Sequence, residues 1–324
     1  MRETEYVYGV ARVRVNELSL LTKNNFEQLI AAANYDAAID VLVQKGWLFE
    51  DRDDYYAAIE NERQKMWQLL SEAAPNVKEL HPLIIANDFQ NLKAAIKAFF
   101  TQEEFEHLLA QPSVYSAQII LDAIKIKAFD DLPELLQEAA KEAFEAIIKH
   151  ESGRLADIAL DKRALMAALE LAEATKSSTL KEIVALNAFV ANINIAMRSV
   201  AIGKQADFMS AAMVKTDALD NDELIEATLD SPEKLEKYIL NHLGESAAKA
   251  FKEGLTAFEK WQDEEVLKLL VASKYTAFGL DPLCAYLLRK EIELKNVRII
   301  LLAKINSLEQ NVIRRRVRLS DDHI

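Results

Sequence analysis

The sequence predicts an all-α protein built from three related helical units. Glycine and proline, the two residues that interrupt helices, number only 7 and 6 in 324 residues. Apolar residues recur at helical spacing along most of the chain, and no alternating run of β-branched residues favours a strand. A short helical pattern also occurs three times at nearly equal intervals, which is typical of a fold made from repeated units.

The repeated pattern is centred on Asn91, Asn192 and Asn296, so the intervals are 101 residues (192 minus 91) and 104 residues (296 minus 192). An apolar residue stands two positions before each asparagine, and others stand one and five positions after it. These offsets form the i, i+3, i+7 seam of a helix, so each window should bury one stripe and hold its asparagine beside that stripe. The three units either stack as a solenoid or close into a pseudo-threefold body. Their expected bounds are 1–110, 111–214 and 215–324.

Caps and breaks locate the helices within these units. Thr101-Gln-Glu-Glu104 has the form of a capping box, and Asp220 stands three residues before Glu223. Ser231-Pro232 and Asp281-Pro282 each place a cap before a proline at the first helical position. The last helix, which follows Gly279, is the clearest. The expected helices cover residues 3–22, 25–45, 52–72, 77–99, 102–110, 114–128, 132–150, 154–175, 179–202, 222–230, 232–242, 254–271 and 282–306.

Composition and charge exclude several classes of protein. A net charge of −13 argues against nucleic-acid binding, which depends on neutralising phosphates with lysine and arginine. The single cysteine excludes a disulfide framework and fits a reducing compartment. No signal sequence opens the chain, and no apolar run approaches the roughly 18 residues of a membrane span. We therefore expect a soluble cytosolic protein, without a span of its own, that meets a membrane only through a partner.

Motifs for catalysis or cofactor binding are nearly absent. The glycines are too far apart for a phosphate-binding loop, and the five histidines do not pair at metal-ligand spacing. Cys284 stands among leucines, where a buried inert thiol is expected. Asp130-Asp131-Leu-Pro-Glu134 has the DDxxD form of a magnesium site, but it also fits an acidic pair that caps a helix beginning near Pro133. A helical magnesium-dependent enzyme therefore remains an alternative to a protein with no cofactor and no metal.

The end of the chain is basic, in contrast to the acidic body. Arg314, Arg315, Arg316 and Arg318 follow the last long helix closely. A basic tail on an acidic body indicates a protein contact, although a solvated tail is the simpler interpretation. We expect internal ion pairs to hold some of these arginines while the others face a partner.

The two ends of the chain carry a more specific pattern. Tyr6-x-Tyr8-Gly9-x-Ala11-Arg12-Val13-Arg14 opens it, and residues 278–304 form its last helix. The pattern in that helix is Gly279-x-Asp281-Pro282, then Tyr286, Lys290-Glu291-x-Glu293, Asn296-x-Arg298 and Lys304. With Arg314-Arg315-Arg316 beyond it, the chain resembles the family of C subunits of the V/A-type rotary ATPases, which corresponds to the eukaryotic d subunit. The resemblance covers the whole chain. The middle unit departs most, because Asn194 stands where Lys93 and Arg298 stand in the outer units.

The resemblance implies a funnel-shaped, pseudo-threefold helical body with a central socket and no catalytic site, nucleotide or ion. Such a protein receives the foot of the central shaft, made of D-type and F-type subunits, in its socket. It rests on the membrane proteolipid ring at the cytoplasmic face of the prokaryotic plasma membrane. There it transmits torque between ATP hydrolysis or synthesis and the transport of H⁺ or Na⁺. The expected partner-binding residues are Asn91, Lys93, Asn192, Arg198, Asn296, Arg298, Arg314, Arg315 and Arg316.

An α-helical repeat scaffold unrelated to rotary ATPases is the alternative from another class. It predicts an open superhelix in which each repeat contacts only its neighbours.

Overall fold

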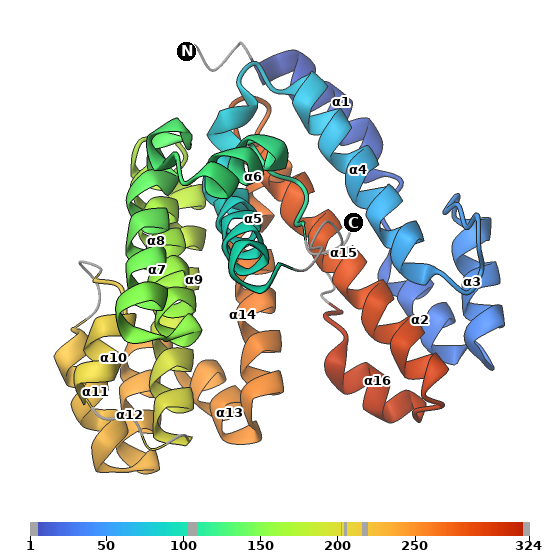
Figure 1. The fold of residues 1–324 in the computed structure, drawn as a ribbon. Helices are drawn as coiled ribbons and strands as arrows, with labels where there is room; N and C mark the ends of the chain where they lie inside the picture. The colour runs from blue at the N-terminus through green and yellow to red at the C-terminus, as the bar shows by residue number, and fades with distance from the viewer. Residues whose placement is uncertain (1–5, 103–108, 202, 204–205, 216–219, 320–324) are drawn as a thin grey trace. The chain divides into compact units, whose positions relative to one another are not determined.

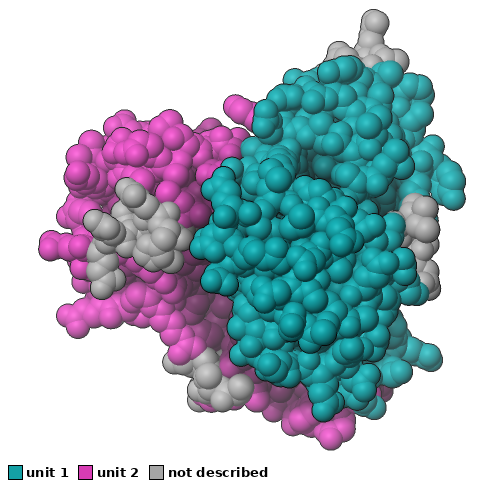
Figure 2. Space-filling model, turned by 90° about the vertical axis from the view of Figure 1, so that its right-hand side faces the viewer, with its two compact units in different colours: residues 1–77, 239–324 teal, residues 78–238 magenta. Residues whose placement is uncertain are grey.

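The computed structural model describes residues 6–102, 109–201, 203, 206–215 and 220–319 (Figure 1). Every regular element within these ranges is a helix and none is a strand, so the predicted all-α class is confirmed. The chain separates into two compact units, one made of residues 1–77 and 239–324 and the other of residues 78–238 (Figure 2). We call them unit 1 and unit 2. The three units predicted above, with boundaries at 110/111 and 214/215, were defined by the sequence repeats, whereas these two units are defined by compactness. The division into three units therefore stays a prediction.

Unit 1 joins the two ends of the chain. Its helices are α1 (Val7–Glu17), α2 (Lys23–Ala31), α3 (Tyr35–Gln44), α4 (Tyr55–Ala73), α13 (Glu245–Glu253), α14 (Leu255–Leu269), α15 (Asp281–Ile305) and α16 (Gln310–Arg316). Helix α15 packs against α1, α2, α3 and α4. The apolar cluster between them combines the two ends, and its members include Phe26, Leu29, Ile39, Leu42, Trp47, Leu294, Val297, Ile300, Leu301 and Ile313. Packing of the first helices on the last long one is not the arrangement of an open superhelix.

Gly9 allows α1 to approach α4 closely. A Cβ atom built at Gly9 would lie 2.4 Å from the carbonyl oxygen of Ala73, far inside van der Waals contact. Only glycine can occupy this position without moving a backbone segment. The glycine in the N-terminal pattern is therefore a packing residue.

Unit 2 is built around helices α5 and α8. Its helices are α5 (His81–Thr101), α6 (Ala117–Ile126), α7 (Glu134–His150), α8 (Gly153–Glu173), α9 (Ser178–Ala201), α10 (Ala206–Ala212) and α11 (Asn221–Asp230). Helix α12 (Pro232–Leu243) crosses the division between the units. Helices α5, α6, α7 and α8 enclose one apolar cluster, and α9 packs on α8, α10 and α11.

Several predicted boundaries need correction. The expected helix 25–45 is two helices, because Ala32 is extended and the Asn34 side chain caps α3 by accepting from the backbone N–H of Ala37. The short helices α10, α13 and α16 were not predicted. Thr101 ends α5 instead of opening a helix, and the rest of the expected helix 102–110 falls largely on residues outside the described ranges.

The predicted caps give a mixed outcome. Asp220 and Ser231 are N-caps as expected, each accepting from backbone N–H groups two or three residues later. Asp281 is instead the first residue of α15, whose N-cap is Leu280. The Asp130–Asp131 pair lies in a short 3₁₀ turn, and α7 begins after Pro133 with no side-chain cap, so the capping interpretation of that pair was wrong.

One helix meets the length and composition of a membrane span, contrary to the prediction that no run comes close. The segment Ser178–Val200 of α9 is long and apolar enough, although half of its most apolar stretch is buried inside the protein. The helix packs on α8, α10 and α11.

Candidate functional site

The three predicted asparagines make the same unusual contact. Each side chain is completely buried, and its amide bonds both backbone groups of one later residue. Asn296 donates to the carbonyl of Arg318 and accepts from its N–H, both at 2.9 Å. Asn192 does the same with Val214 at 2.7 and 3.0 Å. Asn91 does so with Ala110 at 3.2 and 2.6 Å. We call this contact an asparagine clamp.

The clamps hold equivalent segments of the chain. Helix α10 spans positions 14 to 20 after Asn192 (206 and 212 minus 192), and α16 spans the same positions after Asn296 (310 and 316 minus 296). Both clamped residues stand at position 22, and the buried anchors Met209 and Ile313 both stand at position 17. A long helix, a short helix and a clamped return therefore recur with the same spacing. In the first copy the clamp is at position 19 (110 minus 91), and residues 103–108 lie outside the described part of the chain.

These contacts give the asparagines a role inside the protein. A completely buried amide whose donor and acceptor are both engaged stabilises the returning segment, because buried backbone groups need partners. Direct partner binding by Asn91, Asn192 and Asn296 stays a prediction that nothing in the described contacts tests.

The three long helices also expose the same face. Positions −1, +2 and +6 relative to each asparagine are exposed or half-buried on α5, α9 and α15, while the apolar seam is buried apart from Met197, which is half-buried. Three of the six basic side chains predicted to meet a partner stand at these positions, and Lys97 and Lys295 stand there as well. We use the name basic face for the basic side chains at these positions, which are Lys93, Lys97, Arg198, Lys295 and Arg298.

Acidic neighbours compensate some members of the basic face. Lys93 pairs with Asp161 at 2.7 Å and Lys97 with Asp157 at 3.3 Å, both on α8. Lys295 pairs with Asp263 at 2.5 Å. Arg198 and Arg298 are exposed, and neither has an ion pair within the described ranges.

The C-terminal arginines divide into two groups, as the sequence predicted. Arg314 pairs with Glu27 at 3.0 Å, and the nearly buried Arg318 pairs with Asp263 at 2.7 Å. Arg315 and Arg316 are exposed on α16, without an ion pair among the described residues. These two cations are free to meet a partner.

The remaining residues of the α15 pattern form a buried ion network within unit 1. The Lys290 ammonium lies 2.9 Å from Glu62 and 2.6 Å from Glu293, and Glu293 also accepts from the backbone N–H of Leu21 at 2.6 Å. Burial acts to lower the pKa of Lys290, but the two carboxylates outweigh it and raise that pKa. For Glu62, burial acts to raise the pKa, and the adjacent lysines reverse the direction. Charged Lys290 therefore joins α4 to α15, and its partner Glu293 joins α15 to the connection between α1 and α2.

Further contacts extend this network along α15. Glu291 binds Arg63 with both carboxylate oxygens, at 2.9 and 3.2 Å, and Arg289 pairs with Glu17 at 3.1 Å. Lys304 donates to the carbonyls of Ile30 and Ala32 at the end of α2. Sequence reasoning identified most of these residues only as a pattern, because their partners lie more than 200 positions away.

Tyr286, the remaining polar member of the pattern, is also buried. Burial raises the pKa of its hydroxyl to about 12.

The described residues show no arrangement suited to a metal. No group of three or more histidine, cysteine, aspartate or glutamate side chains in these ranges converges on one point. Asp130 is largely exposed and pairs with Lys141 at 3.2 Å. Cys284 is buried, as predicted.

The basic face, α16 and the ion network of α15 all lie within the region that matches a known family. The family model described as the ATP synthase (C/AC39) subunit matches residues 9–316. The C subunit of a V-type sodium ATPase from Enterococcus hirae is 25% identical over 314 residues, which cover 94% of this chain and 96% of the relative. The match begins at Gly9 within the N-terminal pattern and includes the whole C-terminal pattern and all three clamped helices, and the chain belongs to the ATP synthase (C/AC39) subunit family.

Proposed function

We propose that this protein is the non-catalytic central-stalk subunit of a V/A-type rotary ATPase. In this role it forms a pseudo-threefold funnel whose socket holds the D-type and F-type shaft subunits, while its other side rests on the proteolipid ring. It transmits torque between ATP hydrolysis or synthesis in the head and the movement of H⁺ or Na⁺ through the membrane. It works at the cytoplasmic face, and it reaches the membrane through the complex.

The observation that carries this proposal is that basic side chains recur at two positions relative to the asparagines, each in two of the three long helices: Lys93 and Arg298 at +2, and Lys97 and Arg198 at +6. In a chain with a net charge of −13, Arg198, Arg298, Arg315 and Arg316 are exposed and have no ion pair among the described residues. Charges arranged in this way steer a partner and fix its orientation more than they add affinity. The buried clamps and the ion network of α15 support the same role, because a torque-bearing part must resist deformation.

The test is salt-dependent retention of the ATPase head on membranes. Arg315→Glu with Arg316→Glu should leave helicity unchanged, because both side chains are exposed. Such exposed charges are each worth only about 0–1 kcal/mol to stability. The variant should release the head at lower salt than the wild type, or uncouple ATP hydrolysis from ion transport.

Lys45→Glu with Lys249→Glu is the matched control. It makes the same change in net charge at two exposed lysines of unit 1 that have no ion pair in the described ranges. The control should behave as the wild type. Equal retention and intact coupling in the arginine variant would mean that α16 is merely solvated.

A further inference from the structure

Helix α1 is apolar on two opposite sides, and its own unit covers only one of them. Gly9, Val10 and Val13 are buried where the helix packs on α4 and α15 (Figure 1). Every exposed position from the first residue of the helix to its C-cap is also apolar, and these positions are Val7, Tyr8, Ala11, Val15 and Leu18. A helix that is apolar all round is normally buried all round. The outer side of α1 therefore indicates a partner.

The exposed side chains follow the spacing of a coiled-coil seam. Tyr8, Ala11, Val15 and Leu18 stand at i, i+3, i+7 and i+10, which are the a and d positions of two successive heptads. We call these four residues the outer seam. Tyr8, Val15 and Leu18 are 64%, 68% and 87% exposed. Side chains at this spacing fit the holes between side chains of a second helix, so the seam is complementary to a helix rather than to a strand or a loop.

A charged side chain flanks the outer seam. Arg12 stands at position e, and its guanidinium lies 5.7 Å from the centre of the Tyr8 ring. One of its nitrogen atoms, Nη2, pairs with Glu72 at 2.9 Å. A guanidinium has five N–H donors, so further donors remain for a carboxylate of a partner. Positions e and g of a coiled coil form ion pairs between helices, and Arg12 therefore favours a partner helix with an acidic residue at the facing position.

A loop of unit 1 extends the apolar surface beside α1. Arg14 donates to three backbone carbonyls of residues 273–276 and so holds this loop against the helix. Within the loop Tyr275 is 86% exposed, and Phe278, two residues beyond it, is exposed as well. Aromatic side chains are enriched at the centres of protein interfaces. The surface that favours a partner is therefore wider than α1 alone.

The charges at the seam argue against a second copy of this chain as the occupant. The e and g positions within α1 are Val7, Arg12 and Arg14, and none of them is acidic. The seam of a second copy would therefore bring arginine, and no carboxylate of its own helix, to Arg12. Like charges at these positions disfavour pairing, so the seam is better matched to a different protein.

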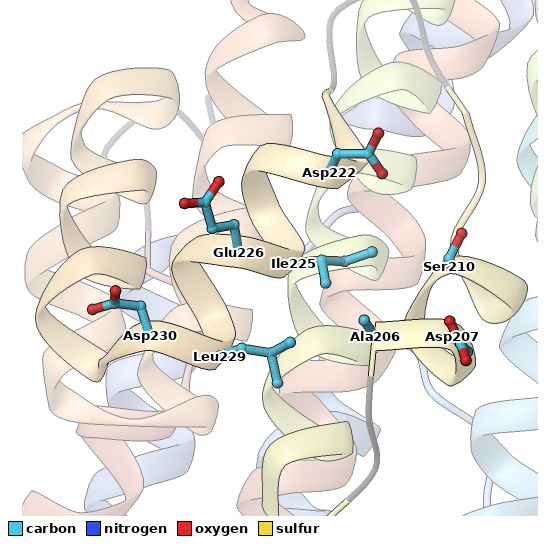
Figure 3. A pocket seen from close by; sticks show the side chains of 8 residues that line it. All are labelled: Ala206, Asp207, Ser210, Asp222, Ile225, Glu226, Leu229 and Asp230. Atoms are coloured by element: carbon cyan, nitrogen blue, oxygen red, sulfur yellow. The ribbon is translucent and has the colours of Figure 1, made fainter.

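The open hollow between α10 and α11 of unit 2 is a surface of a different kind (Figure 3). Its lining includes the exposed carboxylates of Asp207, Asp222, Glu226 and Asp230. Exposed charges are stable in water without a partner, so this hollow requires no occupant. A continuous exposed apolar stripe, in contrast, gains free energy when a partner covers it.

We propose that the outer seam of α1 binds an α-helix of another subunit, and that this helix carries apolar side chains at a, d spacing with a carboxylate facing Arg12. The inference rests on the proposed function only because it places the protein in an ATPase complex. It does not depend on the socket, the shaft or the ring.

Photo-cross-linking in the ATPase complex on native membranes identifies the occupant. The photoreactive residue p-benzoylphenylalanine, in place of Leu18, should link to a segment of another subunit that has the a, d repeat and an acidic residue beside it. The same residue in place of Lys45, which is exposed elsewhere in unit 1, is the matched control and should not link to that segment.

Substitutions test the contribution of the seam to assembly. Val15→Asn with Leu18→Asn should lower the fraction of the chain that migrates with the complex on native gels about tenfold, because both side chains lose their apolar contacts. Val43→Asn with Leu48→Asn changes two exposed apolar residues of unit 1 outside the seam and should stay within about twofold of the wild type. Circular dichroism checks that both variants are folded.

Charge exchange tests the role of Arg12. Arg12→Glu should also lower the fraction in the complex, because it places a carboxylate opposite the carboxylate of the partner. Replacing that partner residue, once the cross-link has identified it, by arginine should restore assembly. A purely internal role for Arg12 in its pair with Glu72 predicts no such restoration.

The outcomes separate this inference from the proposed function. Absence of the wild-type chain from the ATPase complex would overturn the proposed function. In a complex that does contain the wild type, normal assembly of the seam variant would overturn the seam as a binding surface. A link from position 18 only to lipid or to a second copy, no link at all, or no restoration by the exchanged charges would do so too.

Discussion

The asparagine clamps make a quantitative prediction about stability. Replacing Asn296 by alanine removes both hydrogen bonds to Arg318, at 2.9 Å each, and leaves a backbone N–H and a carbonyl without partners in a fully buried place. Each unsatisfied buried group costs about 1–3 kcal/mol, so the loss of partners for two groups should lower the unfolding free energy by about 2–6 kcal/mol. Asn91→Ala removes the same pair of bonds, but its cost should lie at the lower end of this range because Ala110 is only half-buried. Asn192→Ala also removes a bond to Asn221, but the Asn221 amide still donates to the Val214 carbonyl, so the Val214 N–H is the backbone group left without a partner.

The measurement is urea unfolding followed by circular dichroism at the helix minimum. A lower midpoint with an unchanged slope reports lost stability rather than a changed unfolded state. Asn194→Ala is the matched control, because it lies two residues after Asn192 on the same helix and makes no hydrogen bond through its Oδ1 atom. Its cost should stay within about 0.5 kcal/mol.

Two results would refute the reasoning. A cost below about 0.5 kcal/mol in any clamp variant would mean that water or a local shift replaces the two bonds. A cost for Asn91→Ala or Asn192→Ala clearly above that of Asn296→Ala would contradict this count of unsatisfied buried groups.

Three further predictions concern unit 1. Gly9→Ala should destabilise the protein by about 1–3 kcal/mol in thermal unfolding, because its Cβ would meet the Ala73 carbonyl, whereas Gly153→Ala, with nothing within 4 Å, should be neutral or slightly stabilising. Lys290→Met should cost about 3–5 kcal/mol in urea unfolding, because Glu62 and Glu293 lose the ammonium between them. Lys65→Met, which removes an exposed pair with Glu62, should cost at most about 1 kcal/mol, and equal costs would contradict a special role for Lys290. The raised pKa of Tyr286, about 12 in the folded protein against about 10 unfolded, stabilises the fold below pH 10, and this contribution is lost as the pH rises from about 10 to 12. The unfolding free energy measured across that pH range should therefore fall less steeply for Tyr286→Phe than for the wild type. Parallel curves for the two proteins would show that the pKa of the Tyr286 hydroxyl is not raised in the fold.

The fold class and most long helices could be predicted because they depend on local signals. Low glycine content and apolar periodicity are properties of short windows, and they placed α4, α8, α9 and α15 within a few residues of their observed bounds. The break between α2 and α3 escaped detection because the apolar pattern continues across Asn34, and only its cap marks the boundary. Helix α13 lies between Gly244 and Gly254, which adopt positive φ angles of 87° and 107° at its two ends. This pair of glycines was a signal that the sequence offered for the bounds of α13.

The positions of the clamping asparagines could be predicted from the sequence, but the contacts of their side chains could not. The spacing of Asn91, Asn192 and Asn296 located the repeats, yet nothing local says that an amide will bond a backbone 19 or 22 residues later. The packing of α10 on α11 also escaped detection, because α10 had not been predicted. The sequence predicted that some of the C-terminal arginines form internal ion pairs. It could not say which ones, because that depends on the positions of Glu27 and Asp263 in the fold.

The packing of α15 on α1 to α4 affects how the chain reaches its native state during synthesis. The first four helices are made early, but the helix that completes their apolar cluster begins only at Asp281. Unit 2 has an apolar cluster of its own within residues 78–238. The N-terminal helices therefore cannot bury their apolar faces as they do in the native state until almost the whole chain has left the ribosome. The interval between residue 77 and α15 leaves that surface open to other chains, a period in which a chaperone is useful.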